Sequence, residues 1–184
     1  MLHVDFKFPA EHRINGQTFD GEMQIYHIHP GRKRLPVVSV LIKVYEDDYH
    51  DDYDHNEGHN EYLQQVIDAY QYEHDTNMAR SLRWNPYHES LIPTYYFYGY
   101  DGGLTEPPCT EIVSWFVMDK PMIISKNQLE QMKYILFTNV NGDTCEETSV
   151  HFHNSVARPI QETSNRQVWH CTRNDFVPDH ERPT

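Results

Sequence analysis

Alternating hydrophobic and polar positions predict several β-strands along this chain. Near the start, Phe6 and Phe8 alternate with Asp5 and Lys7, so two opposite charges point to one face of a strand and two aromatic rings to the other. Other segments show similar alternation or a short apolar run between turn signals. The predicted strands are 2–8, 22–29, 36–44, 111–118 and 120–125. The pattern therefore indicates a mainly β protein.

Helical spacing is confined to short segments. Residues 60–71 place apolar side chains at i, i+3, i+4 and i+7 from Leu63, which predicts a helix. The run SKNQLEQMK after Ser125 is typical of a capped helix start. We expect both helices to be accessory to the sheet, and we expect the Tyr95–Tyr98 cluster to pack against it.

No internal repeat or linker divides the sequence, so we expect residues 1–184 to form a single domain. Segment 46–61 holds eight acidic residues, three histidines and no Lys or Arg, which predicts an acidic surface loop. It lacks the central glycine and closing glutamate of a calcium loop, so solvation is preferred over cation binding by Asp47, Asp48, Asp51, Asp52 and Asp54. Residues 172–184 are predicted to be a polar tail.

The composition narrows the classes of partner. With 15 basic and 28 acidic residues, the net charge of −13 argues against nucleic acid and anionic lipid surfaces. No window approaches the roughly 18 apolar residues of a membrane helix, so direct membrane insertion is not expected. The three cysteines form no CxxC motif. Cys145 and Cys171 are either a disulfide pair or free thiols.

The run YGYDGGLTEPPCTEIVSWFVMDKPMIISKNQLEQM, at 98–132, resembles the signature of the α-class carbonic anhydrases. Three further segments follow the family's order, at 9–29, 36–44 and 157–161. The resemblance implies a central twisted, mostly antiparallel sheet with short surface helices. It also implies a conical cavity in which three histidines hold a catalytic zinc ion, and a chain that lacks the family's N-terminal third.

The positions that match the family's zinc ligands are all different here. Aligned on the PAEH sequence at 9–12, Asp5 and Lys7 stand where the family has two histidines, and Gln24 stands at the third. A catalytic zinc ion needs three nitrogen, thiolate or carboxylate ligands, and an ammonium group repels it. Shifting the strand by two residues would require an insertion and would supply only His3, Asp5 and Gln24.

Several other positions match the family. Thr105 and Glu11 match the pair that orients the zinc-bound hydroxide, and Glu22 matches the carboxylate that supports the third histidine. These are remnant positions, and we expect no catalytic residue. The apolar wall of the carbon dioxide pocket matches Tyr26, Val37, Leu104, Val113 and Trp115.

The resemblance with its altered ligands favours a non-catalytic carbonic-anhydrase-like module in protein binding or assembly, without a cofactor. The alternative is an active carbonic anhydrase, catalysing reversible CO2 hydration, with an atypical metal site that would hold zinc. A protein partner or a longer parent chain is expected, and the family favours a secreted or organelle-lumenal location. We further predict that Lys7 supplies the positive charge of the absent metal, with Asp5 and Glu11 as counter-charges and Gln24 satisfying the remaining hydrogen bonds.

Overall fold

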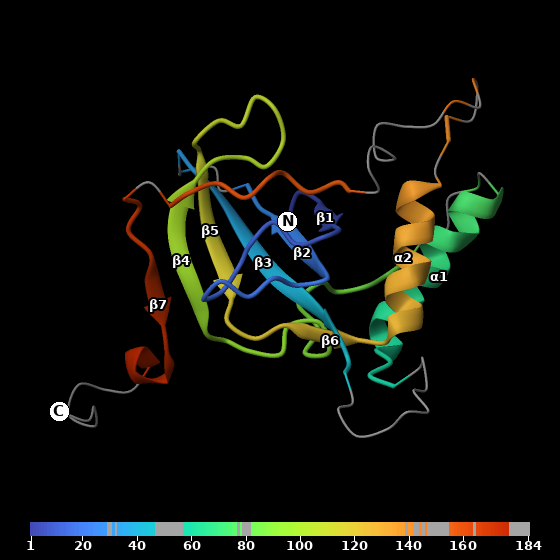
Figure 1. Ribbon diagram of the computed structural model, residues 1–184, viewed down its shortest axis with the longest axis horizontal. Coiled ribbons are helices and arrows are strands. Elements are labelled where there is room, and N and C mark those ends of the chain that lie inside the picture. The colour runs from blue at the N-terminus through green and yellow to red at the C-terminus, as the bar shows by residue number, and fades with distance from the viewer. Residues whose placement is uncertain are drawn as a thin grey trace.

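A seven-stranded sheet forms the centre of the fold in the computed structural model (Figure 1). The structure describes residues 1–28, 31, 33–46, 57–76, 78, 82–138, 140, 141, 144, 146, 155–163 and 165–176. The strands are β1 (Val4–Lys7), β2 (Gly21–Tyr26), β3 (Leu35–Val44), β4 (Phe97–Gly102), β5 (Val113–Met118), β6 (Met122–Ile124) and β7 (Trp169–Cys171).

The sheet is mixed but mostly antiparallel. Its order is β1-β2-β3-β5-β4-β7, and β6 also pairs with β3. The β1–β2, β2–β3, β4–β5 and β4–β7 pairs are antiparallel, whereas β3 runs parallel to β5 and β6. This confirms the predicted fold class. All five predicted strands are present with shifted ends, while β4 and β7 were not predicted as strands.

Two helices lie side by side at one end of the sheet (Figure 1). Helix α1 (Glu61–Thr76) contains the predicted segment, and α2 (Lys126–Phe137) begins at the predicted cap. The Ser125 side chain accepts a hydrogen bond from the Gln128 amide, and the Gln128 side chain accepts one from the Ser125 amide. Gln128 also bonds both backbone groups of Asn60, so it ties the starts of the two helices together. Neither of these described helices is long and apolar enough to cross a membrane.

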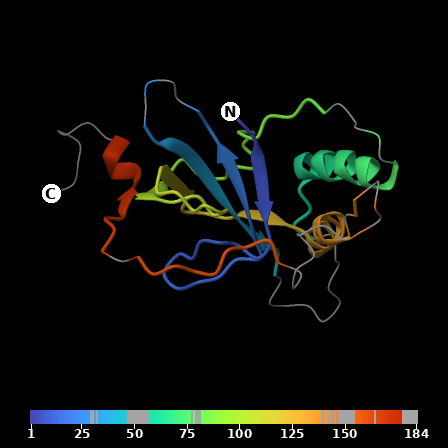
Figure 2. The ribbon, with the colours of Figure 1, turned by 90° about the horizontal axis from the view of Figure 1, so that it is seen from above.

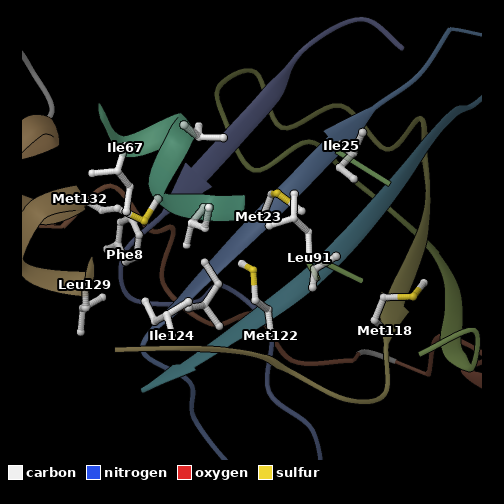
Figure 3. Close-up of a cluster of buried hydrophobic side chains, with 14 residues drawn as sticks. Phe8, Met23, Ile25, Ile67, Leu91, Met118, Met122, Ile124, Leu129 and Met132 are labelled. Atoms are coloured by element: carbon white, nitrogen blue, oxygen red, sulfur yellow. The ribbon is translucent and has the colours of Figure 1, made fainter. Parts of the chain in front are cut away.

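The two faces of the sheet carry different apolar clusters. Met23 and Ile25 of β2 belong to the cluster that includes side chains of α1 and α2, among them Ile67 and Leu129 (Figure 3). A second cluster contains Tyr26, Val37, Leu41, Val113, Trp115 and Val117. Because side chains alternate along a strand, the β2 residues Glu22, Gln24 and Tyr26 point away from Met23 and Ile25. We call the side that carries them the polar face of the sheet.

Some predictions concern residues outside the described part of the chain. The five aspartates of the acidic loop fall within 47–56, so the loop and the preference for solvation over cation binding stay predictions. Cys145 is also outside, and Cys171, for which the sequence leaves both a disulfide and a free thiol open, is a free cysteine in the structure. In the tail, Arg173–Phe176 forms a short 3₁₀ helix after β7.

Candidate functional site

The β1–β2 pair brings together the three residues predicted at the zinc-ligand positions. Asp5 lies directly opposite Gln24, and Lys7 lies opposite Glu22. Residues opposite each other on one sheet face have Cβ atoms about 5 Å apart, and Lys7 is two residues from Asp5 on the same face. The structure therefore places all three side chains in one cluster on the polar face.

Lys7 is a buried cation paired with two carboxylates. Its side chain is 7% exposed, and its Nζ donates to Glu106 Oε1 at 2.7 Å and lies 3.8 Å from Asp5 Oδ2. Burial alone lowers the pKa of Lys7, but the hydrogen bond to Glu106 and the charges of Glu11, Asp5 and Glu106 outweigh it, so this pKa is raised. Lys7 is therefore an ammonium ion at neutral pH. Glu106, which follows Thr105 directly, was not among the site residues predicted from the sequence.

Gln24 is completely buried and uses both ends of its amide. Its Nε2 donates to Glu11 Oε2 and to Glu22 Oε1, each at 2.8 Å. Its Oε1 accepts a hydrogen bond from the Tyr26 hydroxyl at 2.9 Å. Because carboxylates accept hydrogen bonds and cannot donate them, these partners fix which end of the amide is nitrogen.

The cluster does not fit a zinc ion. Asp5 supplies a carboxylate, Lys7 an ammonium that repels cations, and Gln24 an amide whose oxygen already accepts from Tyr26. Within the described residues, no group of three or more His, Cys, Asp or Glu side chains could hold a metal ion. No catalytic step through zinc follows from this geometry.

Glu22 and His12 form a buried ion pair behind the cluster. Glu22 accepts hydrogen bonds from the amides of Glu11 and His12, at 2.9 and 3.0 Å, from Ser39 Oγ at 2.8 Å and from His12 Nδ1 at 2.7 Å. Burial alone raises the pKa of Glu22, but the charge of His12 and these side-chain hydrogen bonds hold it at about 2. Burial alone lowers the pKa of His12, but the charge and hydrogen bond of Glu22 outweigh it, so this pKa is raised. His12 Nε2 lies 2.6 Å from the Tyr100 hydroxyl.

Thr105 and Glu11 are near the cluster but are not joined by a hydrogen bond. Glu11 Oε1 accepts from the Arg158 amide at 2.7 Å, and its Oε2 accepts from Gln24. Thr105 Oγ1 is buried and makes no hydrogen bond to Glu11. The Thr105–Glu11 hydrogen bond expected of a pair that orients a zinc-bound hydroxide is therefore not made in this geometry.

The predicted apolar wall is assembled as packed core. Tyr26, Val37, Val113 and Trp115 are buried in the second cluster, and Leu104 packs against it. The Tyr26 and Trp115 rings meet edge to face, with centroids 6.4 Å apart. The wall residues are thus brought together, and Tyr26 connects them to the polar cluster through Gln24.

Comparisons with known proteins agree on one family. The family model for eukaryotic-type carbonic anhydrases matches residues 3–172. Dioscorin dioA3 from Dioscorea japonica is 29% identical over 170 residues, which cover 92% of this chain and 54% of the dioscorin. Human "Carbonic anhydrase 5A, mitochondrial" is 26% identical over 173 residues, which cover 87% of this chain and 50% of the human protein.

A solved structure shows the same fold at low sequence identity. The halotolerant carbonic anhydrase from Dunaliella salina superposes with a TM-score of 0.68, covering 91% of this chain and 58% of that chain, at 20% identity. The chain spans about half the length of the curated relatives that it matches.

Proposed function

Because this chain belongs to the eukaryotic-type carbonic anhydrase family, we propose that it is a non-catalytic member that serves in protein binding or assembly. The observation that carries the proposal is the pairing of the buried Lys7 ammonium with Glu106 at 2.7 Å, next to Asp5 and Gln24. In this proposal these three residues replace the zinc ligands of the family.

The physical reason is that one site cannot hold an ammonium and a zinc ion together. Lys7 Nζ has its own counter-charges in Glu106 and Asp5, and the raised pKa keeps it protonated at neutral pH. Zinc-catalysed hydration of carbon dioxide depends on a metal-bound water whose pKa lies near 7. A site with no metal has no such nucleophile, so hydration of carbon dioxide is not expected.

Metal analysis and stopped-flow CO2 hydration of the purified chain, refolded with zinc and dialysed, test the proposal. We expect far less than one zinc ion per chain and a hydration rate at the uncatalysed background. The triple variant Asp5→His/Lys7→His/Gln24→His is the matched positive control, which we expect to retain zinc. Stoichiometric zinc in the unmodified chain, with hydration abolished by a chelator, would establish the alternative of an active enzyme with an atypical site.

We also propose that this chain acts together with a protein partner or as part of a longer parent chain. Its proposed location is secreted or organelle-lumenal. The compartment rests on relatives such as the human protein named as mitochondrial. Fractionation of cells that express the tagged chain tests it, and recovery only in the cytosol would contradict it.

A further inference from the structure

A cleft of about 700 Å³ lies on the polar face beside the cluster of Asp5, Lys7 and Gln24, none of which is among its lining residues, although Glu11 both lines it and accepts from Gln24. It is bounded by the loop after β1, by β4 and β5, and by residues 158–163, 166 and 168. Figure 2 shows the loop after β1, in blue, and this C-terminal segment, in orange-red, on the same side of the sheet. The volume falls in the range of about 300–1,000 Å³ that is usual for small-molecule sites.

Arg158 brings a cation to this cleft. Its backbone amide is used by Glu11, and within the described part of the chain its guanidinium makes one hydrogen bond, from Nη1 to the Leu104 carbonyl at 3.4 Å. No carboxylate of the described residues forms an ion pair with this guanidinium. Arg166, also in the cleft wall, differs because its Nη2 donates to Glu111 Oε1 at 2.5 Å. Most of the five N–H donors of Arg158 therefore remain available to a ligand.

Tyr100 adds a hydroxyl donor to the same cleft. Its oxygen lies 2.6 Å from His12 Nε2, and His12 Nδ1 is paired with Glu22. With His12 protonated, which its raised pKa favours, the imidazolium donates from both nitrogens, and the Tyr100 proton is left for a ligand in the cleft that Tyr100 lines.

The rest of the lining suits an apolar body. Trp115 and Val117 contribute from β5 and are already buried, whereas Ile160 and Val168 of the lining have 45% and 49% of their surface exposed. Ile160 and Val168 gain free energy when a flat apolar group removes them from water.

Two acidic residues of the lining are held by other groups of the chain. Both oxygens of Glu11 accept hydrogen bonds from neutral donors, the Gln24 side chain and the Arg158 backbone amide, and Glu111 is neutralised by its pairing with Arg166. Glu162 lies on the exposed surface of the 158–168 segment.

We propose that this cleft binds a small-molecule carboxylate with a flat apolar body, its carboxylate accepting hydrogen bonds from Arg158 and Tyr100. Charge-assisted bonds from guanidinium to carboxylate are among the strongest in proteins, and an aromatic acid matches both the donors and the apolar walls. The carboxylate site does not use Asp5, Lys7 or Gln24, so this proposal can be tested independently of the proposed lack of zinc binding.

Isothermal titration of the full chain with 2-naphthoate, against the neutral 2-naphthamide, tests this site. We expect saturable 1:1 binding of naphthoate and about tenfold weaker binding of the amide, because the amide loses the charge-assisted bonds. Arg158→Gln and Tyr100→Phe should each weaken naphthoate about tenfold and leave naphthamide nearly unchanged. The matched controls Arg173→Gln and Tyr95→Phe change exposed residues outside the cleft and should bind as the parent does.

Thermal unfolding of each variant shows whether it is folded, which matters for Tyr100 because of its bond to His12. Arg158→Gln keeps the backbone bond to Glu11 and provides the independent second variant. Equal affinity for acid and amide, no binding of naphthoate, or unchanged affinity in folded Arg158→Gln would each overturn the proposal.

Discussion

Replacing Lys7 with Met tests how the buried charge is held. The substitution keeps the length of the apolar stem but removes the ammonium that pairs with Glu106 and Asp5. The two carboxylates then lose their common cation. How much stability this costs depends on how far water can reach them.

The exposure of the partners sets the magnitude. A hydrogen bond to a charged group contributes about 1.5–3 kcal/mol, and stranding one partner of a fully buried ion pair costs about 3–5 kcal/mol. Here the Glu106 side chain is 68% exposed and that of Asp5 is 27% exposed, so water solvates both once Lys7 is gone. The buried Met side chain recovers part of the loss. We expect Lys7→Met to lower the free energy of unfolding by about 1–2 kcal/mol.

Replacing the partner, Glu106, should lower the free energy of unfolding by more. Glu106→Met leaves the Lys7 ammonium buried, with Asp5 at 3.8 Å as its closest carboxylate, and we expect a loss of about 2–3 kcal/mol. Combining the two changes should cost less than the sum of the single losses, by about 1 kcal/mol.

Urea unfolding at pH 7, followed by tryptophan fluorescence, measures these differences. With slopes of about 1–3 kcal/mol per molar urea, Lys7→Met should lower the midpoint by about 0.5–1 M. A midpoint equal to that of the parent would mean that Lys7 is solvated in the native state. A larger loss for Lys7→Met than for Glu106→Met would equally refute the reasoning, because Lys7 is the more deeply buried partner.

Three further predictions concern other parts of the fold. The pKa of Glu22, held at about 2, is lower than in the unfolded chain, so its stabilisation is present above pH 4.5 and is lost as pH falls toward 2. Between pH 4.5 and 2, the loss in the free energy of unfolding should be about 3 kcal/mol smaller in Glu22→Gln than in the parent. An unchanged pH profile of the free energy of unfolding would contradict the pairing with His12. Gln128→Ala should cost about 2–4 kcal/mol in urea unfolding because it strands the buried backbone groups of Asn60, whereas the control Gln71→Ala, which removes a solvent-exposed hydrogen bond to Asp75, should cost less than 0.5 kcal/mol. Gly99→Ala places a Cβ 2.3 Å from the Trp169 ring and should displace it, seen as a red-shifted fluorescence, and an unshifted spectrum would show that the ring does not lie over Gly99.

The sequence predicted those strands whose apolar pattern is strong and local. The run 36–44 became β3 almost unchanged, because a central strand buried on both faces is apolar along its length. Strand β4 escaped detection because its sequence, FYGYDG, contains two glycines and an aspartate, which disfavour strands in isolation. Pairing with β5 on one side and β7 on the other holds it in place.

The site was predictable where it depends on neighbouring residues and on the family resemblance. Alternation placed Asp5 and Lys7 on one face, and the resemblance placed Gln24 beside them. The main partner of Lys7 was not predictable, because Glu106 lies 99 residues further along the chain. The Tyr100–His12 contact spans 88 residues and is equally invisible to local periodicity. Such contacts depend on strand order, which this sequence alone does not specify.

The saturated amide of Gln24 has an evolutionary consequence. Its single nitrogen bridges Glu11 and Glu22, and its oxygen holds Tyr26. A lone change to histidine at this position removes that bridge while Lys7 still repels a metal, so the intermediate loses stability and gains no zinc. A lone change at Lys7 leaves Glu106 and Asp5 without their cation. Selection acting one substitution at a time therefore meets a loss at each of these first steps, and the hydrogen bonds of Gln24 make it difficult to build a zinc site here by single substitutions.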